Sequence, residues 1–414
     1  MKVRFWLIRP ILSTCSRTLM HLPCSSLRNK RSRTCLAEGP DSECTPTESI
    51  QQRPPPLKVP LLLPRGKENE FVLARRSRRR KSVSLDHLPE ELLLRIYSCL
   101  PLHDLLRISG VSRRWQRLAS DESLWYSVDL EGLTHVGPAL QQVLRTGVRR
   151  LRCPRAFVEE QYLTDSRPLQ IVELDLSSSI IPTSTLQNIL GRCRLLHHLS
   201  LEGLQLSNSI ISCLVKNSNL LQLNLSGCSG FSSAALTELL QSCCRLEQLN
   251  VSWCSFSSDH VKSVVGHLSP TVSALNLSGY RESLTLDDVK VLVDRCPHIQ
   301  TLDLSDGTLL TANSFPVLRQ LRKLLHLSLS RCYHIHLAAL SDLEKLIPSL
   351  RFLDIFGLVQ ENQLLSLKEE LPHISINSRP FSAVARPTPA SRPDRSMWGR
   401  TCRLRSDPLN HSKS

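Results

Sequence analysis

Apolar residues recur along most of the chain with a period of about 26 residues. Each copy holds two leucines, or similar aliphatic residues, separated by one residue, as in "LDL", "LNL" and "LSL". This alternation predicts a short β-strand that turns both leucines toward the same core. The first leucines of the eight clearest copies are Leu174, Leu199, Leu223, Leu249, Leu275, Leu302, Leu327 and Leu353. Weaker copies at Val128, Leu151 and Ile374 bring the expected strands to about eleven.

A second apolar pattern lies between the strands. Its residues are spaced i, i+3 and i+4, which predicts a helix with one buried face. Each such group begins 12 to 14 residues before the strand leucine that follows it. The groups are Leu186, Ile189 and Leu190; Ile211, Leu214 and Val215; Leu236, Leu239 and Leu240; Val261, Val264 and Val265; and Val289, Leu292 and Val293. Strand and helix together have the period of a leucine-rich repeat, so we expect an α/β horseshoe-shaped solenoid over residues 126–378, with strands inside and helices outside.

Residues 84–125 follow a different, purely helical pattern. Pro89 suits the first position of a helix, and Asp104 and Ser112 suit the starts of two further short helices. The apolar residues of the first helix recur every four positions, at Leu88, Leu92, Ile96 and Leu100. The segment therefore predicts a small all-α unit in front of the solenoid.

The first helix carries three consecutive leucines, Leu92–Leu94, which is more than one core requires. Successive helical residues are about 100° apart, so the three cover roughly 200° of the helix surface, whereas one core needs a stripe of about 100°. The surplus apolar face needs a second neighbour, which is either the solenoid or another protein. Because a segment of about 40 residues rarely folds alone, both neighbours are compatible with the pattern.

The net charge of +15 belongs to the two ends of the chain and not to the solenoid. Residues 1–81, whose composition predicts a disordered arm, hold 18 Lys and Arg against 6 Asp and Glu. Residues 379–414 hold 8 against 2, and the residues between the two ends hold 26 against 29, a net charge of −3. A fold that binds nucleic acid carries its positive charge on the folded body. We therefore expect no nucleic-acid partner.

The basic arm contains two short motifs. The run "ARRSRRRK" is either a nuclear import signal or a solvated basic stretch. Its basic residues are Arg75, Arg76, Arg78, Arg79, Arg80 and Lys81. Lys67–Asn69 spells the KEN tripeptide that coactivators of the anaphase-promoting ligase recognise. The first 37 residues are basic and lack acidic groups, a composition also found in transit peptides for organelle import.

No motif predicts catalysis or a bound cofactor. The sequence lacks HExxH, GxSxG, GxGxxG and Walker-type patterns. Its 15 cysteines include no CxxC, and several recur in register with the repeat, which predicts buried structural thiols in a reducing compartment. No apolar run approaches the roughly 18 residues that suggest a membrane span. We expect a non-catalytic binding protein without metal, cofactor or membrane partner.

Unusual residues gather at one position of the later repeats. Two residues beyond the second leucine of each strand, most repeats have Gly or Ser, but three have Trp253, Asp306 and Arg331. The next two positions bring Tyr280, Arg281 and Tyr333. Trp, Tyr and Arg are enriched at binding hot spots, and two arginines beside aromatic rings suit an acidic or phosphorylated peptide. This cluster is the predicted ligand-binding surface.

The stretch "LPEELLLRIYSCLPLHDLLRISGVSRRWQRLASDESLW" resembles an F-box, the helical module that docks on a Skp-type adaptor. Together with "NLSGCSGF", "NVSWCSF", "LNLSGYR", "LSLSRCY" and "FSAVARPT", it is similar to the F-box and leucine-rich-repeat substrate receptors of cullin-RING ubiquitin ligases. The resemblance covers about residues 84–404. An alternative is a leucine-rich-repeat scaffold without a ubiquitin-ligase role, which would not bind the adaptor.

The resemblance implies partners and site residues. The adaptor, and through it cullin and RING subunits, would contact the F-box helices at Leu88, Pro89, Leu92, Leu93, Ile96, Leu100, Val111 and Trp115. A Cks-type accessory protein and a phosphorylated Kip-type inhibitor of cyclin-dependent kinases would contact Trp253, Tyr280, Arg281, Asp306, Arg331, Tyr333 and Phe381. In relatives, the C-terminal tail folds back along the concave face, so residues 379–414 with Trp398 are expected to do so here. We expect the chain itself to work in the nucleus, and also in the cytoplasm.

Overall fold

The computed structural model describes residues 85–133, 136–160, 166–387 and 396–405. The basic run Arg75–Lys81 and the KEN tripeptide lie outside the described residues, so both stay predictions. The described residues all fall within one compact unit, 79–414.

The F-box segment consists of short helices around a small core. They are η1 (Leu85–His87), α1 (Glu90–Tyr97), α2 (Leu102–Ile108) and α3 (Arg113–Ala119). Pro89 lies at the N-cap of α1 and not at its first helical position. The hydroxyl of Ser112 accepts a hydrogen bond from the backbone N–H of Trp115 at 3.2 Å, which starts α3 as expected. Leu93, Tyr97 and Leu105 form the buried core of this segment.

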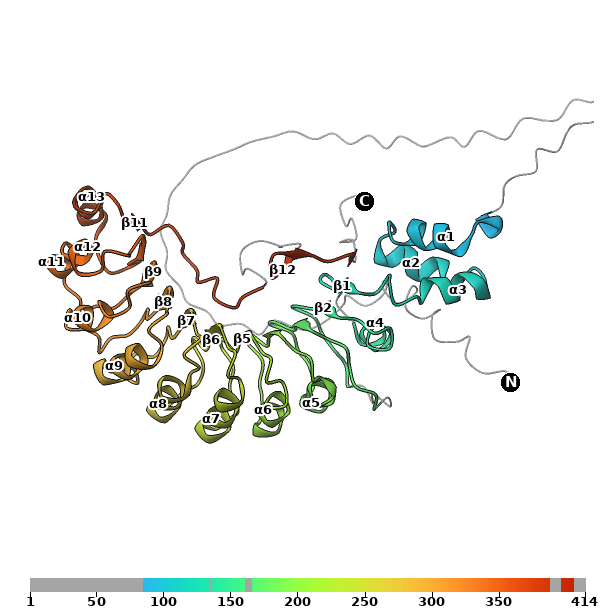
Figure 1. Cartoon of the computed structure of the whole chain (residues 1–414), viewed down its shortest axis with the longest axis horizontal. Coiled ribbons are helices and arrows are strands. Elements are labelled where there is room, and N and C mark those ends of the chain that lie inside the picture. Colours follow the sequence, from blue (N-terminus) through green and yellow to red (C-terminus); the bar gives the residue numbers. More distant parts are fainter. Residues whose placement is uncertain (1–84, 134–135, 161–165, 388–395, 406–414) are drawn as a thin grey trace, which may run out of the picture. The chain divides into compact units, whose positions relative to one another are not determined.

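The repeats build one parallel sheet, and the predicted α/β solenoid is confirmed (Figure 1). Its strands run in chain order from one end of an arc to the other, with the helices on the outside. The strands are β1 (Ser127–Asp129), β2 (Arg150–Arg152), β3 (Glu173–Asp175), β4 (His198–Ser200), β5 (Gln222–Asn224), β6 (Gln248–Asn250), β7 (Ala274–Asn276), β8 (Thr301–Asp303), β9 (His326–Ser328), β10 (Phe352–Asp354) and β11 (Ser375–Ile376). The helices are α4 (Gly137–Val143), α5 (Thr183–Arg192), α6 (Asn208–Leu214), α7 (Ser233–Ser242), α8 (Ser258–His267), α9 (Leu286–Arg295), α10 (Ser314–Leu318), α11 (Leu337–Leu340), α12 (Leu343–Leu346) and α13 (Glu361–Glu370).

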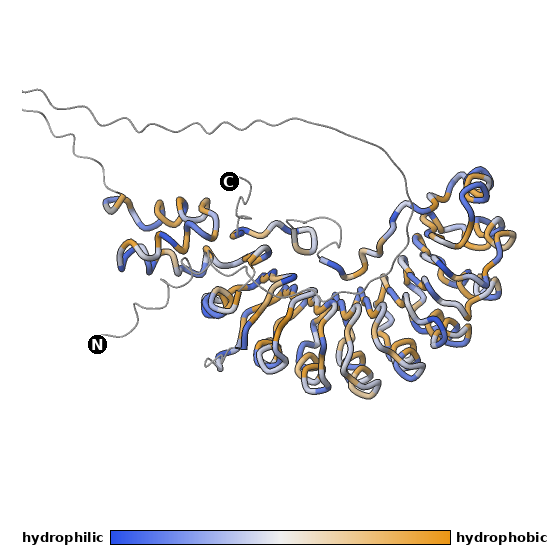
Figure 2. The backbone as a smooth tube through the Cα atoms, turned by 180° about the vertical axis from the view of Figure 1, so that it is seen from behind, coloured by the Kyte–Doolittle hydropathy of each residue, from blue (hydrophilic) through white to orange (hydrophobic). Residues whose placement is uncertain are grey.

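The core of the solenoid follows the predicted leucines. All eight are the central residues of β3 to β10 and have no exposed surface. Figure 2 shows the resulting hydrophobic segments recurring in the strands and helices of each repeat. The last strand was misplaced by two residues, because Ile376, and not Ile374, pairs in register with Leu353. In α6, Ile210 joins Ile211 and Leu214 in the core, and Val215 lies just past the end of the helix.

The cysteines in repeat register are free thiols packed in the solenoid core. Cys193, Cys228, Cys254, Cys296 and Cys332 are all buried. Of the neighbouring pair, Cys243 is buried and Cys244 is exposed. Burial raises the pKa of the Cys193 thiol to about 12 and that of Cys254 to about 11. Thiols with such pKa values are poor nucleophiles at neutral pH, so packing explains their presence.

The described part of the C-terminal tail runs back along the inside of the arc (Figure 1). Near its start, the side-chain amide of Asn250 donates to the carbonyl of Val384 at 3.1 Å. Further on, Arg386 donates to Glu202 at 2.8 Å, and Arg400 donates to Glu173 at 2.8 Å. The antiparallel strands β12 (Ser396–Met397) and β13 (Arg400–Thr401) lead to β14 (Leu404–Arg405), which adds to the open edge of β1 as the sheet's twelfth strand.

Candidate binding surfaces

The F-box helices separate neighbouring leucines into two environments. Leu93 lies in the core with no exposed surface, whereas 45% of Leu92 is exposed. Ile96, one turn further along α1, and Val111, after α2, are also exposed. These three residues form the F-box face. The solenoid leaves them uncovered, so the surplus apolar surface inferred from Leu92–Leu94 is present in the fold.

The other residues proposed for adaptor contact differ in accessibility. Pro89 is exposed, and Leu88 and Leu100 are half-buried. Trp115 is half-buried, with its ring 5.8 Å from that of Tyr97. Leu93 needs correction as an adaptor contact, because its side chain is enclosed by the segment's own core. The spacing of apolar residues along α1 predicts a helix, but it does not indicate whether Leu92 or Leu93 is on the side that faces the internal core.

The second candidate surface lies where the chain leaves the later strands. We define the turn patch as Trp253, Arg281, Asp306, Arg331 and Tyr333. Trp253, Asp306 and Arg331 adopt left-handed backbone conformations, with φ of 56°, 62° and 59°. The equivalent residues of the other repeats with clear strands have positive φ as well, and they are Ser178, Gly203, Gly227, Gly279 and Gly357.

The turn itself therefore demands the left-handed conformation, and glycine adopts it without strain. For other residues that conformation costs about 1–2 kcal/mol each. Three large or charged side chains accept this cost within four successive repeats, from β6 to β9. Strain that persists at neighbouring positions is a feature of functional sites.

A buried carboxylate lies beside both arginines of the turn patch and holds one of them. Asp306, whose side chain is 2% exposed, accepts a hydrogen bond from Arg331 Nε at 2.9 Å. The guanidinium of Arg281 lies 3.9 Å from the same carboxylate and is largely exposed. The hydrogen bonds that Arg331 donates to the Asp306 carboxylate raise the pKa of Arg331. Two cations against one anion leave a net positive charge, which suits an anionic ligand.

The Trp253 ring of the patch packs between the Arg331 side chain and the backbone of Gly279. The guanidinium carbon of Arg331 lies 6.0 Å from the centre of the Trp253 ring, within the range of a cation–π contact. A Cβ atom at Gly279 would lie only 2.8 Å from Cδ2 of Trp253. The indole therefore occupies space that only a glycine leaves free. Trp253, half exposed, keeps an open face for a partner.

Tyr280 is not part of this surface, contrary to the prediction. It is 3% exposed, its hydroxyl donates to the carbonyl of Val251, and its ring stacks on Phe256 at 5.7 Å. Burial raises the pKa of its hydroxyl far above the ordinary value. The sequence held a signal for this, because Tyr280 occupies the position of Cys228 and Cys254, which were expected to be buried. Tyr333 and Phe381, by contrast, are exposed.

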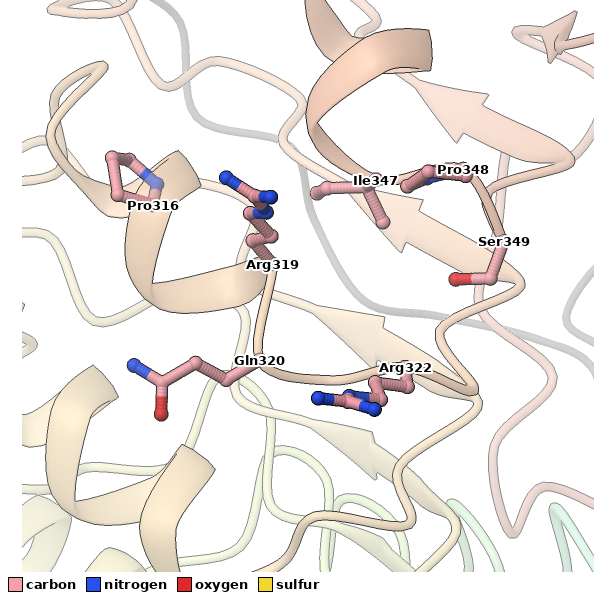
Figure 3. Close-up of a pocket in the computed structure, with 7 residues that line it drawn as sticks. All are labelled: Pro316, Arg319, Gln320, Arg322, Ile347, Pro348 and Ser349. Carbon is pink, nitrogen blue, oxygen red and sulfur yellow. The ribbon is translucent and has the colours of Figure 1, made fainter.

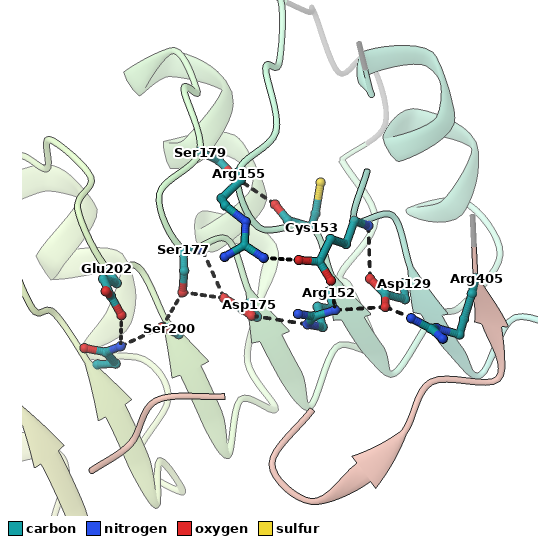
Figure 4. A network of polar contacts seen from close by, with 12 residues as sticks. Asp129, Arg152, Cys153, Arg155, Asp175, Ser177, Ser179, Ser200, Glu202 and Arg405 are labelled. Carbon is teal, nitrogen blue, oxygen red and sulfur yellow. Dashed lines mark hydrogen bonds and ion pairs between the residues drawn. The ribbon is translucent and has the colours of Figure 1, made fainter. Parts of the chain in front are cut away.

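A charged network under the tail was not anticipated from the sequence (Figure 4). Arg152, with no exposed surface, donates to Asp129 at 2.9 Å and lies 3.8 Å from Asp175. Burial lowers the pKa of Arg152, but the surrounding carboxylates outweigh it and the pKa is raised. Arg405 of the tail lies 3.6 Å from Asp129. The network joins the tail to the first strands. Its residues are far apart in the sequence, so no local sequence pattern predicts it.

Two further classes of site are absent from the described residues. No group of three or more His, Cys, Asp or Glu side chains among them is placed to hold a metal ion. None of the helices in the described ranges is long and apolar enough to cross a membrane.

Two family models match the sequence. Residues 138–405 match the model described as SKP2 LRR domain, and residues 85–131 match the model described as F-box-like. F-box/LRR-repeat protein 12 of Homo sapiens is 44% identical over 62 residues, which are 15% of this chain and 19% of that protein. F-box protein SKIP19 of Arabidopsis thaliana is 23% identical over 266 residues, 64% of this chain and 74% of that protein.

The chain thus spans about a fifth of the length of the human relative. Among solved structures, the leucine-rich repeat-containing protein LegL7 from Legionella pneumophila overlaps with a TM-score of 0.35 at 20% identity. The overlap covers 50% of this chain and 74% of that one.

Proposed function

The chain belongs to the F-box/leucine-rich-repeat family, and on that premise we propose that it is the substrate receptor of an SCF-type ubiquitin ligase. The F-box binds a Skp-type adaptor and through it the cullin and RING subunits. The solenoid holds the substrate near the ubiquitin-charged enzyme and performs no chemistry, so it acts by raising the effective concentration of the substrate.

The observation that carries this proposal is the F-box face. Leu92, Ile96 and Val111 expose apolar surface that no other described residue covers, and the family match supplies the class of partner. Burial of one such side chain contributes about 1.5–3 kcal/mol when it is complete. Three partly exposed side chains therefore account for a substantial part of a stable association.

The test is binding of purified full-length chain to recombinant Skp-type adaptor. Val111→Asp places a charge in the F-box face, and we expect it to weaken adaptor binding at least tenfold. The matched control is Val291→Asp, which charges a similarly exposed valine on α9 of the solenoid and should leave binding unchanged. A wild-type chain that ignores the adaptor would favour the alternative, a leucine-rich-repeat scaffold without ubiquitin chemistry.

We further propose that the receptor is of the S-phase kinase-associated protein 2 type. On this view, the turn patch and Phe381 bind a Cks-type accessory protein and a phosphorylated Kip-type inhibitor of cyclin-dependent kinases. The inhibitor is then ubiquitinated and degraded, which promotes progression of the cell cycle. Support comes from the description of the matching repeat model and from the positive, half-exposed turn patch. The receptor acts in the nucleus and cytoplasm, with Arg75–Lys81 as its import signal.

Arg281→Ala with Arg331→Ala tests the ligand side of this proposal. Capture of the phosphorylated inhibitor should fall at least tenfold, and adaptor binding should stay unchanged because the F-box face is separate. Unchanged capture would place the ligand site elsewhere. Deletion of residues 74–81 tests the import signal, and a deleted chain that still enters nuclei would contradict it.

A further inference from the structure

The opposite rim of the solenoid carries a second positively charged feature. This rim consists of the loops that precede the strands, whereas the turn patch consists of loops that follow them. Because the strands are parallel, the two sets of loops lie at opposite edges of the sheet. A ligand bound at one edge therefore does not occupy the other.

Three other arginines on this rim donate hydrogen bonds to backbone carbonyls of the protein itself. Arg194 donates to the carbonyls of Gly191 and Cys193, both at 2.6 Å, and Arg295 donates to the carbonyl of Leu268 at 2.5 Å. Arg351 donates to the carbonyls of Pro348 and Leu350 at 2.9 and 2.8 Å. Carbonyls at the ends of helices carry partial negative charge, so a guanidinium there stabilises the fold. These arginines have a structural explanation.

Arg319 and Arg322 differ from the others. Both are exposed, and the guanidinium of neither has a hydrogen-bond or ion-pair partner among the residues that the structure describes; only their backbone N–H groups donate, to Phe315 and Gln320. Lys323, the next residue, is exposed and equally without a partner in the described ranges. Three cations within five residues, with no ion-pair partner in the described ranges, repel one another, so their charges do not stabilise the fold.

The two arginines border a hollow of about 460 Å³ between neighbouring repeats (Figure 3). Arg319, Gln320 and Arg322 line it from the segment that follows α10, and Ile347–Ser349 line it from the segment that follows α12. The lining residues include no acidic side chain. The guanidinium groups of Arg319 and Arg322 and the hydroxyl of Ser349 are hydrogen-bond donors at its border, whereas the Gln320 side chain points away from the second segment (Figure 3). Pro316 and Pro348 supply exposed apolar surface, and Ile347 is buried beneath.

We propose that this hollow is a second anion-binding site, which binds a phosphate group carried on a peptide. Two guanidinium groups can each make paired hydrogen bonds to phosphate oxygens, and such charge-assisted bonds are about twice as strong as neutral ones. The apolar wall favours a phosphate attached to a chain over a free ion. The site would let the receptor hold a phosphorylated segment at the edge of the sheet opposite the turn patch.

The experiment measures binding of a fluorescent phosphoserine pentapeptide, Ala-Ala-pSer-Ala-Ala, to the full-length chain by fluorescence anisotropy. The turn patch is first disabled by Arg281→Gln with Arg331→Gln, so that only the second site is read. In this background, Arg319→Gln with Arg322→Gln should weaken binding at least tenfold. Arg319→Lys with Arg322→Lys keeps the charge but removes the paired geometry, so it should cause a smaller loss.

The matched control is Arg95→Gln with Arg113→Gln, which removes the same charge from two exposed F-box arginines and should change binding less than twofold. The unphosphorylated peptide should not bind. Inorganic phosphate that competes as well as the peptide would support the anion site but assign it to a free ion. Equal binding of the background protein with and without Arg319 and Arg322, or tighter binding of a single-stranded oligonucleotide than of the peptide, would overturn the proposal. Failure here leaves the adaptor test untouched.

Discussion

The F-box and the solenoid use leucine in opposite ways. In β3 to β10, every patterned leucine is fully buried, and the pattern requires nothing beyond the fold. In α1, Leu93 is buried and its neighbour Leu92 is half exposed. An apolar pattern whose residues are all buried within the fold indicates only how the chain folds. Apolar residues in excess of that requirement are evidence of a partner.

The largest loss of stability should come from replacing a leucine whose whole side chain is buried in the solenoid core. Leu275→Ala removes a fully buried side chain from β7 and leaves a cavity, so it should lower the free energy of unfolding by about 2–5 kcal/mol. Urea denaturation followed by circular dichroism measures the change. A loss below about 1 kcal/mol would mean that the solenoid core is not closely packed at β7.

Acid should loosen the inner face of the solenoid where the tail crosses it. Burial lowers the pKa of His198 to about 4 from an ordinary value near 6.5, and the ring lies 5.2 Å from that of Trp398. A depressed histidine pKa means that stability is complete above pH 6.5 and is lost as pH falls toward 4, up to about 3 kcal/mol.

The measurement is thermal unfolding of the wild type and of His198→Gln between pH 7.5 and 4.5. The wild type should lose more stability than the variant over this interval. Parallel curves for the two proteins would show that His198 does not titrate as its burial requires.

A smaller effect is expected from the glycine under the turn patch. Gly279→Ala places a methyl group against the Trp253 indole at a residue with φ of 96°, so it should cost about 1–2 kcal/mol and weaken ligand capture. Its control is Gly266→Ala in α8, where a Cβ would meet nothing within 4 Å and should be neutral or slightly stabilising. Thermal unfolding and capture of the phosphorylated inhibitor measure both. Equal behaviour of the two variants would remove the proposed role of Gly279.

The smallest change in stability should come from the leucine that is in excess. Leu92→Ala should alter the free energy of unfolding by less than about 1 kcal/mol, because its exposed half contributes little to the internal core. Adaptor binding, measured by calorimetry, should weaken several-fold. If instead Leu92→Ala destabilises the chain as much as Leu275→Ala, the distinction between the two regions fails.

Periodicity predicted the solenoid because each repeat is a local unit that contacts only its neighbours. The strand leucines, the helix faces and the cluster of Trp253, Asp306 and Arg331 all follow from one register. Tyr280 was misread because large polar aromatic residues are usually placed at surfaces, whereas its column faces inward. Its position in the repeat, shared with the buried Cys228 and Cys254, correctly indicates burial, whereas its residue type does not.

Long-range pairings could not be predicted in the same way. The tail strand β14 pairs Leu404 with Val128, and Arg152 joins carboxylates from different repeats. Neither pairing recurs along the chain, so neither produces a periodic pattern in the sequence. The choice between Leu92 and Leu93 as the buried residue also depends on how three helices pack. Patterns of single elements do not contain that information.

The addition of β14 to β1 has a consequence for synthesis on the ribosome. At roughly 5–20 residues per second, the partner of the first strand emerges tens of seconds after that strand has been made. Throughout this interval, the growing chain presents the unpaired backbone edge of β1, just after the F-box in the sequence. Nascent chains of this protein therefore need protection at their beginning until translation has passed Leu404, and truncated products should aggregate through that edge.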